Sequence, residues 1–163
     1  MTIQIKCATA GDIPELLASV DALVTTDAGR YDAGATNLSW AGQSGVAYCT
    51  HLLASAESLV LLACDGDYVV GHLVGRIGGP GSLHPVSIAE LESIHVYPAH
   101  RGRGAGHHLM TAFLAWAARN GAQRATITAY TANDGAQRFY ARYGFAPKSV
   151  ILDLDELPPV PDR

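Results

Sequence analysis

The spacing of apolar and polar residues changes several times along the chain, and each change predicts an element of secondary structure. Strict alternation over residues 2–7 predicts a strand, because the side chains of a strand point alternately to its two faces. A helical period over 12–24 predicts a helix with one buried face. Residues 25–45 are rich in Thr, Asp, Gly and Ala, which predicts a loop, and a second helix is expected over 46–55.

Two apolar runs in the middle of the chain predict a hairpin. They cover 58–64 and 68–77, and the dipeptide Asp65-Gly66 between them is typical of a tight two-residue turn. Gly78-Gly79-Pro80-Gly81 ends the second run, and the next strand is expected over about 86–97.

The second half of the chain continues with strands and helices in turn. After a glycine-rich loop, a helical pattern runs up to a stop at Gly121. A strand is then expected over 125–130, a helix after Asn133, and a final strand over about 145–154. Residues 158–163 are rich in proline and are expected to form a frayed tail. The predicted order is β-α-α-β-β-β-α-β-α-β, a mixed α/β arrangement.

Composition narrows the class of protein. A chain of 163 residues, 48% of them hydrophobic, predicts a single domain over 1–157 with a proper core. The net charge of −4 argues against general affinity for nucleic acid. The apolar runs are too short to span a bilayer, and the first residues lack the pattern of a signal peptide. Cys7, Cys49 and Cys64 are scattered and odd in number, which indicates reduced thiols. We therefore expect a cytoplasmic protein with no nucleic-acid or membrane partner.

The stretch 91–110 has the composition of an anion-binding site. A strand that ends at Pro98 leads into the loop 101–106, and a helix follows. The first N–H groups of a helix have no partner inside it, glycines let the backbone curl around a phosphate, and Arg101 and Arg103 add positive charge. The residues after the glycines do not fit a P-loop, and the glycine spacing does not fit a dinucleotide fingerprint. A plain connecting turn is the alternative.

Two motifs resemble the GNAT superfamily of N-acetyltransferases. The first is Arg101-x-x-Gly104-x-Gly106, and the second is Asn133-x-x-Ala136-x-x-x-Tyr140-x-x-x-Gly144-Phe145. The resemblance spans about 2–154 and implies a GNAT-like fold, with a central, mostly antiparallel mixed sheet of about six strands flanked by four helices. It also implies acetyl-CoA (coenzyme A) as the cofactor. Its pyrophosphate would lie on the loop formed by Arg101, Gly102, Arg103, Gly104, Ala105 and Gly106.

The same resemblance implies that the backbone of Ile94, His95 and Val96 binds the pantetheine arm like an added strand. Leu91 and Ile94 are an odd number of residues apart, so strict alternation cannot place both on one face. A β-bulge near Ser93 would resolve the phase and turn a backbone N–H toward the acyl carbonyl. Alternatively, Leu91 faces the other side of a strand that is buried on both faces.

Two residues of the second motif are candidates for cofactor chemistry. Tyr140 is the candidate general acid for the departing thiolate, since the pKa of a phenol, about 10, lies above that of a thiol. The alternative for Tyr140 is a core aromatic, and Tyr143 is the competing tyrosine. Asn133 either contacts the pantetheine arm or caps its helix.

The amine must lose a proton before it can attack the thioester. Glu90 and Glu92 are two residues apart on the predicted strand and share a face, so either is a candidate base, directly or through water. Two solvated carboxylates are the alternative, and His95 is a further candidate. His107 and His108 are neighbours on a helix and point in different directions, so we expect no metal site.

These observations predict an acetyl-CoA-dependent N-acetyltransferase that acts on the primary amine of a small molecule by direct attack. The alternatives are a protein N-terminal or lysine acetyltransferase and a non-catalytic acyl-CoA-binding module, and a homodimer remains open. Specificity is expected in the segment 25–45, which carries Tyr31 and Trp40 as apolar surfaces and Asp27 and Asp32 as partners for a cation. A flexible surface loop is the alternative for that segment.

Overall fold

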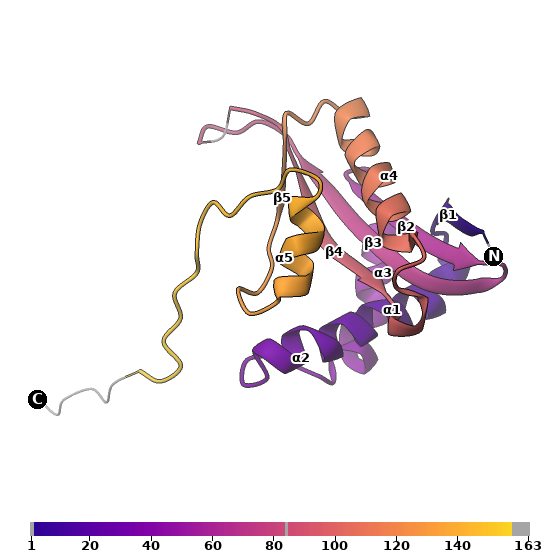
Figure 1. Ribbon diagram of the computed structural model, residues 1–163, viewed down its shortest axis with the longest axis horizontal. Helices are drawn as coiled ribbons and strands as arrows, with labels where there is room; N and C mark the ends of the chain where they lie inside the picture. The colour runs from indigo at the N-terminus through magenta and orange to yellow at the C-terminus, as the bar shows by residue number, and fades with distance from the viewer. Residues whose placement is uncertain (1, 84, 158–163) are drawn as a thin grey trace, which may run out of the picture. The chain divides into compact units, whose positions relative to one another are not determined.

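The computed structural model describes residues 2–83 and 85–157 (Figure 1). Its strands are β1 (Ile3–Cys7), β2 (Ser58–Asp65), β3 (Tyr68–Gly78), β4 (Ile88–Val96) and β5 (Arg124–Ile127). Its helices are α1 (Ile13–Thr26), α2 (Ala28–Tyr31), α3 (Val46–Ala54), α4 (Ala105–Arg119) and α5 (Asp134–Ala141). The chain divides into two compact units, the first ending at Tyr130 and the second beginning at Thr131.

The five strands form one sheet in the order β1-β2-β3-β4-β5. The first four pair antiparallel and β5 pairs parallel with β4, which confirms the mostly antiparallel mixed sheet that the resemblance implies. The predicted hairpin is present, because Asp65 pairs with Tyr68 across the turn and Gly66 has a φ of 60°. Glycine adopts this left-handed conformation at little cost.

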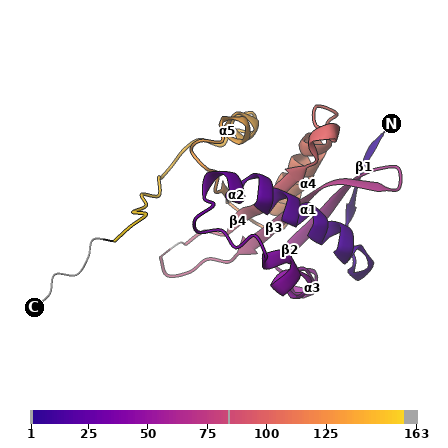
Figure 2. The same cartoon turned by 90° about the horizontal axis from the view of Figure 1, so that it is seen from below.

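Helices cover both faces of the sheet in the first unit, α4 on one face and α1 and α3 on the other (Figures 1 and 2). The α4 face is packed tightly at Gly75, where an added Cβ would lie 2.8 Å from the ring of Phe113. Only a residue without a side chain fits beneath that ring. The other face holds an apolar cluster made of Leu16, Val20, Cys49, Leu52, Val60, Leu62, Cys64 and Val74.

The expectation of a loop over 25–45 is wrong in part. Helix α1 continues to Thr26, the short helix α2 follows directly, and a π-helical turn covers Ala41–Gly45 before α3. Helical backbone hydrogen bonds continue past the end of α1, because the N–H of Asp27 donates to the carbonyl of Leu23. Ala is the best helix former and Thr costs no more than about 0.7 kcal/mol per residue, so these hydrogen bonds suffice to continue the helix.

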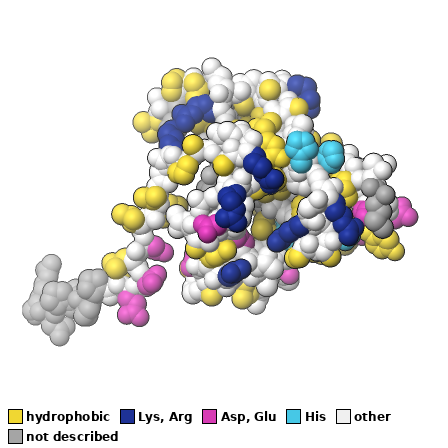
Figure 3. Space-filling view, viewed as in Figure 1, with side chains coloured by type: hydrophobic (Ala, Val, Ile, Leu, Met, Phe, Trp, Pro, Cys, Tyr) yellow, Lys and Arg dark blue, Asp and Glu magenta, His cyan; other side chains and the backbone are white. Residues whose placement is uncertain are grey.

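The final strand expected over 145–154 is not formed, so the described sheet has five strands instead of about six. Apolar and acidic side chains lie close together along this segment, and Ile151 and Leu152 are 86% and 90% exposed (Figure 3). An apolar pattern makes a strand only where another strand accepts its backbone hydrogen bonds, and the described part of the second unit supplies none. The expected tail at 158–163 lies outside the described residues.

Candidate active site

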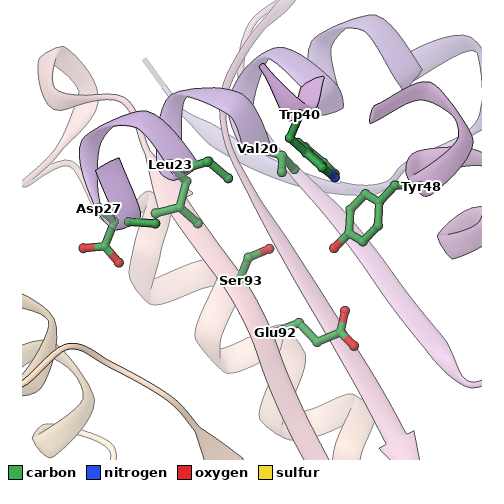
Figure 4. A pocket seen from close by; sticks show the side chains of 9 residues that line it. Val20, Leu23, Asp27, Trp40, Tyr48, Glu92 and Ser93 are labelled. Atoms are coloured by element: carbon green, nitrogen blue, oxygen red, sulfur yellow. The ribbon is translucent and has the colours of Figure 1, made fainter. Parts of the chain in front are cut away.

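Strand β4 contains a β-bulge, which confirms the irregularity expected near Ser93. Val74 of β3 pairs with Ser93, whereas the next residue of β3, Gly75, pairs with Leu91. Glu92 is therefore an extra residue in β4. As a result, two consecutive side chains, Glu92 and Ser93, lie on the same side of the sheet, toward α1 (Figure 4).

A cavity of about 310 Å³ lies beside the bulge, on the α1 face (Figure 4). Residues from α1, α2, α3 and β4 line it, together with the segment that precedes the π-helical turn. The lining residues are Val20, Leu23, Val24, Asp27, Ala28, Trp40, Tyr48, Glu92 and Ser93. Most of them are apolar, and two of the few polar side chains, Glu92 and Ser93, lie next to each other on the strand. A mostly apolar lining with a few polar groups is usual for a small-molecule site.

The carboxylate of Glu92 is held in place by an arginine. The Nε of Arg76 donates to Oε1 of Glu92 at 2.8 Å. The phenol of Tyr48 faces the same cavity, and burial, followed by the charge of Glu92, raises the pKa of Tyr48 to about 12. Tyr48 thus stays protonated and can donate a hydrogen bond. Glu90 is exposed and does not line the cavity, so the structure brings only one of the two candidate carboxylates to it.

A chain of buried polar side chains begins at the bulge. The Oγ of Ser93 lies 3.0 Å from Nε2 of His72, and Nδ1 of His72 lies 2.7 Å from Oγ of Ser19. The same Oγ of Ser19 lies 3.1 Å from Nδ1 of His95. Ser19 and His72 are fully buried and His95 is nearly so. The four side chains therefore form one hydrogen-bonded line from the cavity wall into the core, and we refer to them as the Ser-His chain.

Both imidazoles of the Ser-His chain are neutral at ordinary pH. Burial, and then the charge of His95, lowers the pKa of His72 from 6.5 to about 3. Burial, and then the charge of Arg101, lowers the pKa of His95 to about 4. The sequence analysis proposed His95 as a candidate base. In the structure His95 is buried within the Ser-His chain and does not line the cavity.

The glycine-rich loop has the backbone geometry of an anion cradle. Gly102 and Gly104 have φ values of 75° and 90°, and Gly104 is the N-cap of α4, whose first turn carries no acidic residue. The Nε of Arg101 donates to the carbonyl of Val96 at 2.9 Å, which ties the loop to the end of β4. Left-handed glycines followed by a helix N-terminus suit a phosphate group, so the residues present fit the pyrophosphate of coenzyme A.

The remaining candidates lie in the second unit, on α5. The side chain of Asn133 accepts a hydrogen bond from the N–H of Ala136 at 3.0 Å, so Asn133 caps its helix. The ring of Tyr140 packs edge-on against Phe139 and Phe145, at 5.4 and 6.2 Å between ring centroids. Burial raises the pKa of Tyr143. Tyr140 is only half-buried and helix α5 has no fully buried residue, so these ring contacts leave part of its side chain exposed.

The segment 25–45 contributes two of its four named side chains to the cavity. Asp27 and Trp40 line it, while Asp32 and Tyr31 do not. The ring of Tyr31 instead packs against Tyr130, at 5.3 Å between centroids. Tyr48, which reaches the cavity from α3, was not predicted from the sequence as a site residue.

A family model for the acetyltransferase (GNAT) family matches residues 31–145. The chain belongs to this GNAT family. The GNAT chain is 36% identical over 90 residues to an uncharacterized N-acetyltransferase of Methanocaldococcus jannaschii, which covers 55% of this chain and 35% of the relative. It thus spans about a third of that relative's length.

Solved structures show the same fold for this GNAT chain. A transcriptional regulator from Bacillus halodurans is similar with a TM-score of 0.75 and 22% identity, over 94% of this chain and 99% of the regulator. An aminoglycoside N-acetyltransferase in complex with CoA is similar with a TM-score of 0.71 and 16% identity, over 94% and 93% of the two chains. The TM-scores show the shared fold, and at these identities the likeness concerns the fold alone. Among the described helices, none has the length and apolar character needed to cross a bilayer.

Proposed function

We propose that the chain transfers an acetyl group from acetyl-CoA to the primary amine of a small molecule. The observation that carries this proposal is the cavity at the β4 bulge, where Glu92 and Ser93 lie side by side against an apolar wall. A carboxylate and a hydroxyl in an apolar pocket suit a positively charged amine with an organic body.

The loop from Arg101 to Gly106 would hold the pyrophosphate through backbone N–H groups and arginine side chains. The backbone of Ile94, His95 and Val96 would bind the pantetheine arm as an added strand. When bound, the cofactor supplies an activated acyl group as a thioester.

Glu92 is the proposed acceptor for the amine proton, directly or through a water molecule. It is preferred over Glu90 and His95 because it alone of the three lines the cavity. Its ion pair with Arg76 fixes the direction of the carboxylate. Bound acetyl-CoA would supply the acyl carbon for attack by the amine nitrogen, with the CoA thiolate as the leaving group. Tyr140 is proposed, on the family motif alone, to protonate the leaving thiolate, and Asn133 to cap the helix that carries it.

Cofactor binding is tested by the melting temperature with and without acetyl-CoA. A ligand that binds only the folded state stabilises it by about 2.7 kcal/mol at a hundredfold excess over Kd. Gly104→Val should abolish most of this shift, since Gly104 has a φ of 90° and its N–H lies at the anion cradle. Gly81→Val, in an exposed turn with open space around it, is the matched control. An undiminished shift in folded Gly104→Val would refute the role of the loop.

Turnover is tested by release of the CoA thiol in the presence of small amines. Glu92→Gln should lower kcat/KM about 10²- to 10⁴-fold at neutral pH. The activity of this variant should recover as the pH approaches the pKa of the free amine. Glu90→Gln is the comparison, and a larger loss there would reassign the base. Acetyl-CoA binding without turnover of any amine would instead favour a non-catalytic acyl-CoA-binding module.

A further inference from the structure

The wall of the cavity opposite β4 is mostly apolar. Val20, Leu23, Val24 and Ala28 contribute aliphatic surface from two consecutive helices. The rings of Trp40 and Tyr48 meet edge-on at 5.2 Å with an angle of 74° between their planes, so each ring restrains the other. A ligand that lies against this wall gains by removing apolar surface from water and forms few hydrogen bonds there.

Two carboxylates line the cavity, and only that of Glu92 lies beside Ser93 at the bulge. Glu92 already pairs with Arg76, so the acidic end is partly neutralised. The carboxylate of Asp27 points away from Tyr48 and Glu92 (Figure 4). A polycation would need several carboxylates around it to replace its water, because an unpaired charge is costly to bury. The carboxylates of Glu92 and Asp27 lie apart, so they do not surround one site together (Figure 4).

We infer that the acceptor is a primary amine with a single positive charge and an apolar body, preferably an aromatic ring. This inference rests on the proposed acetyl transfer. The amine would lie at Glu92 and Ser93, and the ring would lie against Trp40 and Leu23. A volume of about 310 Å³ corresponds to roughly ten water molecules, so a ligand of about ten heavy atoms fits it.

The test compares kcat/KM for three kinds of acceptor under identical conditions. 2-Phenylethylamine represents the inferred class, kanamycin represents a polycation, and a tripeptide with a free N-terminus represents a protein substrate. Burial of one aromatic ring corresponds to a factor of about 10 to 100, so 2-phenylethylamine should exceed both others by at least tenfold. A preference for kanamycin or for the tripeptide would overturn the inferred class while leaving acetyl transfer in place.

Two variants sharpen the comparison. Trp40→Ala should raise KM for 2-phenylethylamine about tenfold and leave KM for methylamine, which lacks the ring, within about twofold. Leu38→Ala is the matched control, since Leu38 lies two residues earlier, is half exposed and does not line the cavity. Equal effects of Trp40→Ala on both amines would contradict the ring position.

A binding readout separates this inference from the proposed function. If no amine is acetylated, acetyl transfer is refuted, yet 2-phenylethylamine alone should still raise the melting temperature through the cavity. That shift should vanish in Trp40→Ala and persist in Leu38→Ala. A protein that shows no shift with 2-phenylethylamine, or shows the same shift in both variants, would overturn the inferred class of ligand.

The Ser-His chain carries a second inference, because its hydrogen count allows only two arrangements. The hydroxyl of Ser19 has one proton and lies between the Nδ1 atoms of His72 and His95. With both rings neutral, Ser19 donates to one Nδ1 and accepts from the other. Either His72 then donates through Nε2 to Ser93, or Ser93 donates to Nε2 of His72. The orientation of the Ser93 hydroxyl thus depends on the position of the Ser19 proton, two hydrogen bonds away through His72.

We infer that Ser19, His72 and His95 are positioning residues that set the hydroxyl of Ser93 at the cavity. When Ser93 donates to His72, its lone pairs are directed to the cavity and can accept from an ammonium group. When Ser93 accepts from His72, its proton is free to bond a carbonyl oxygen. In the step to the arrangement in which Ser93 donates, one proton moves along each of the three links, from His95 to Ser19, from Ser19 to His72 and from His72 to Ser93. Both rings stay neutral because Nε2 of His95 takes up a proton from water and the original hydroxyl proton of Ser93 leaves to the cavity, and the reverse step returns both.

The test is a double-mutant cycle on kcat with His72→Phe and Ser93→Ala. Each single variant should lower kcat about 3- to 30-fold, the range of one hydrogen bond, and the double variant should lose no more than Ser93→Ala alone. Independent, multiplicative losses would overturn the inference. Val60→Ala is the control for packing, because Val60 of β2 is buried in the same cluster and should lower stability without lowering kcat.

A readout independent of turnover completes the test. Nitrogen-15 NMR of the imidazoles should show one of the two rings, His72 or His95, protonated at Nδ1 and the other at Nε2. Ser19→Ala, a milder change than His72→Phe if the latter fails to fold, should abolish this complementarity. Identical tautomers in both rings of the native protein would overturn the chain as a positioning device.

Discussion

On the face of the sheet covered by α4, the core is entirely apolar where helix meets strand. Leu109, Met110 and Phe113 are fully buried there. On the face covered by α1, the core contains the Ser-His chain, and the cavity opens beside it. Both faces belong to the same strands, since β3 turns Gly75 to one side and His72 to the other.

This difference indicates which face does more than hold the fold together. A buried polar group is costly unless it is hydrogen-bonded, and an apolar core of the same shape would serve stability as well or better. The α4 face uses that simpler solution. Polar residues are kept on the α1 face next to a cavity and a bulge, which is where chemistry would need them.

The largest expected effect concerns the apolar face of the sheet, which α4 covers. Phe113→Ala should lower the free energy of unfolding by about 3–5 kcal/mol, because it removes a fully buried ring and leaves a cavity above Gly75. Urea denaturation measures this. Thr111→Ala, an exposed position of the same helix, should change it by less than about 0.5 kcal/mol. A loss below about 1 kcal/mol in Phe113→Ala would show that the α4 face is not tightly packed.

Acid should lower the free energy of unfolding through the two buried imidazoles on the α1 face. The pKa values of His72 and His95 are lowered from 6.5 to about 3 and 4, so below pH 6.5 the unfolded chain binds more protons than the folded one. The stability these rings provide is complete above pH 6.5 and falls as the pH drops toward 4 and then 3. Each ring contributes a slope of about 1.4 kcal/mol per pH unit inside its window.

The measurement is the free energy of unfolding between pH 7 and pH 4.5. His72→Gln should reduce the slope of unfolding free energy against pH by about 1.4 kcal/mol per pH unit, the contribution of one imidazole. His51→Gln, at an exposed position of α3, should not alter the slope. A native protein with a flat profile over this range would contradict the burial of neutral imidazoles.

The smallest effect concerns the hydroxyl at the centre of the Ser-His chain. Ser19→Ala should cost about 1–3 kcal/mol of unfolding free energy, because two buried ring nitrogens lose their shared partner. Ser44→Ala, at an exposed position, should be neutral within about 0.5 kcal/mol. Equal stability of Ser19→Ala and the native protein would mean that another group satisfies the rings.

The features predicted correctly from the sequence were those encoded by neighbouring residues. The odd step from Leu91 to Ile94 indicated the bulge, Asp65-Gly66 indicated the hairpin, and the motif at Gly104 indicated the loop geometry. Each of these depends on the local phase of side chains or on backbone freedom at glycine.

The features that were missed depend on residues far apart in the chain. Tyr48 reaches the cavity from α3, and Ser19 meets two histidines that lie 53 and 76 residues away. Their only signal was a polar residue inside an apolar pattern, as with His72 in the run 68–77. The strand expected over 145–154 failed for the same reason, because pairing is a property of two segments and the pattern describes one.

The bulge has one further consequence for how such a site can arise. Ser93 and Ile94 keep the faces that a regular strand would give them directly after Leu91, so Glu92 adds a side chain without displacing any other. Deletion of this single residue would leave an ordinary antiparallel strand with the same buried residues. A one-codon insertion is thus sufficient to place a carboxylate beside a serine on one face, and the fold can accept or lose it while its core stays in register.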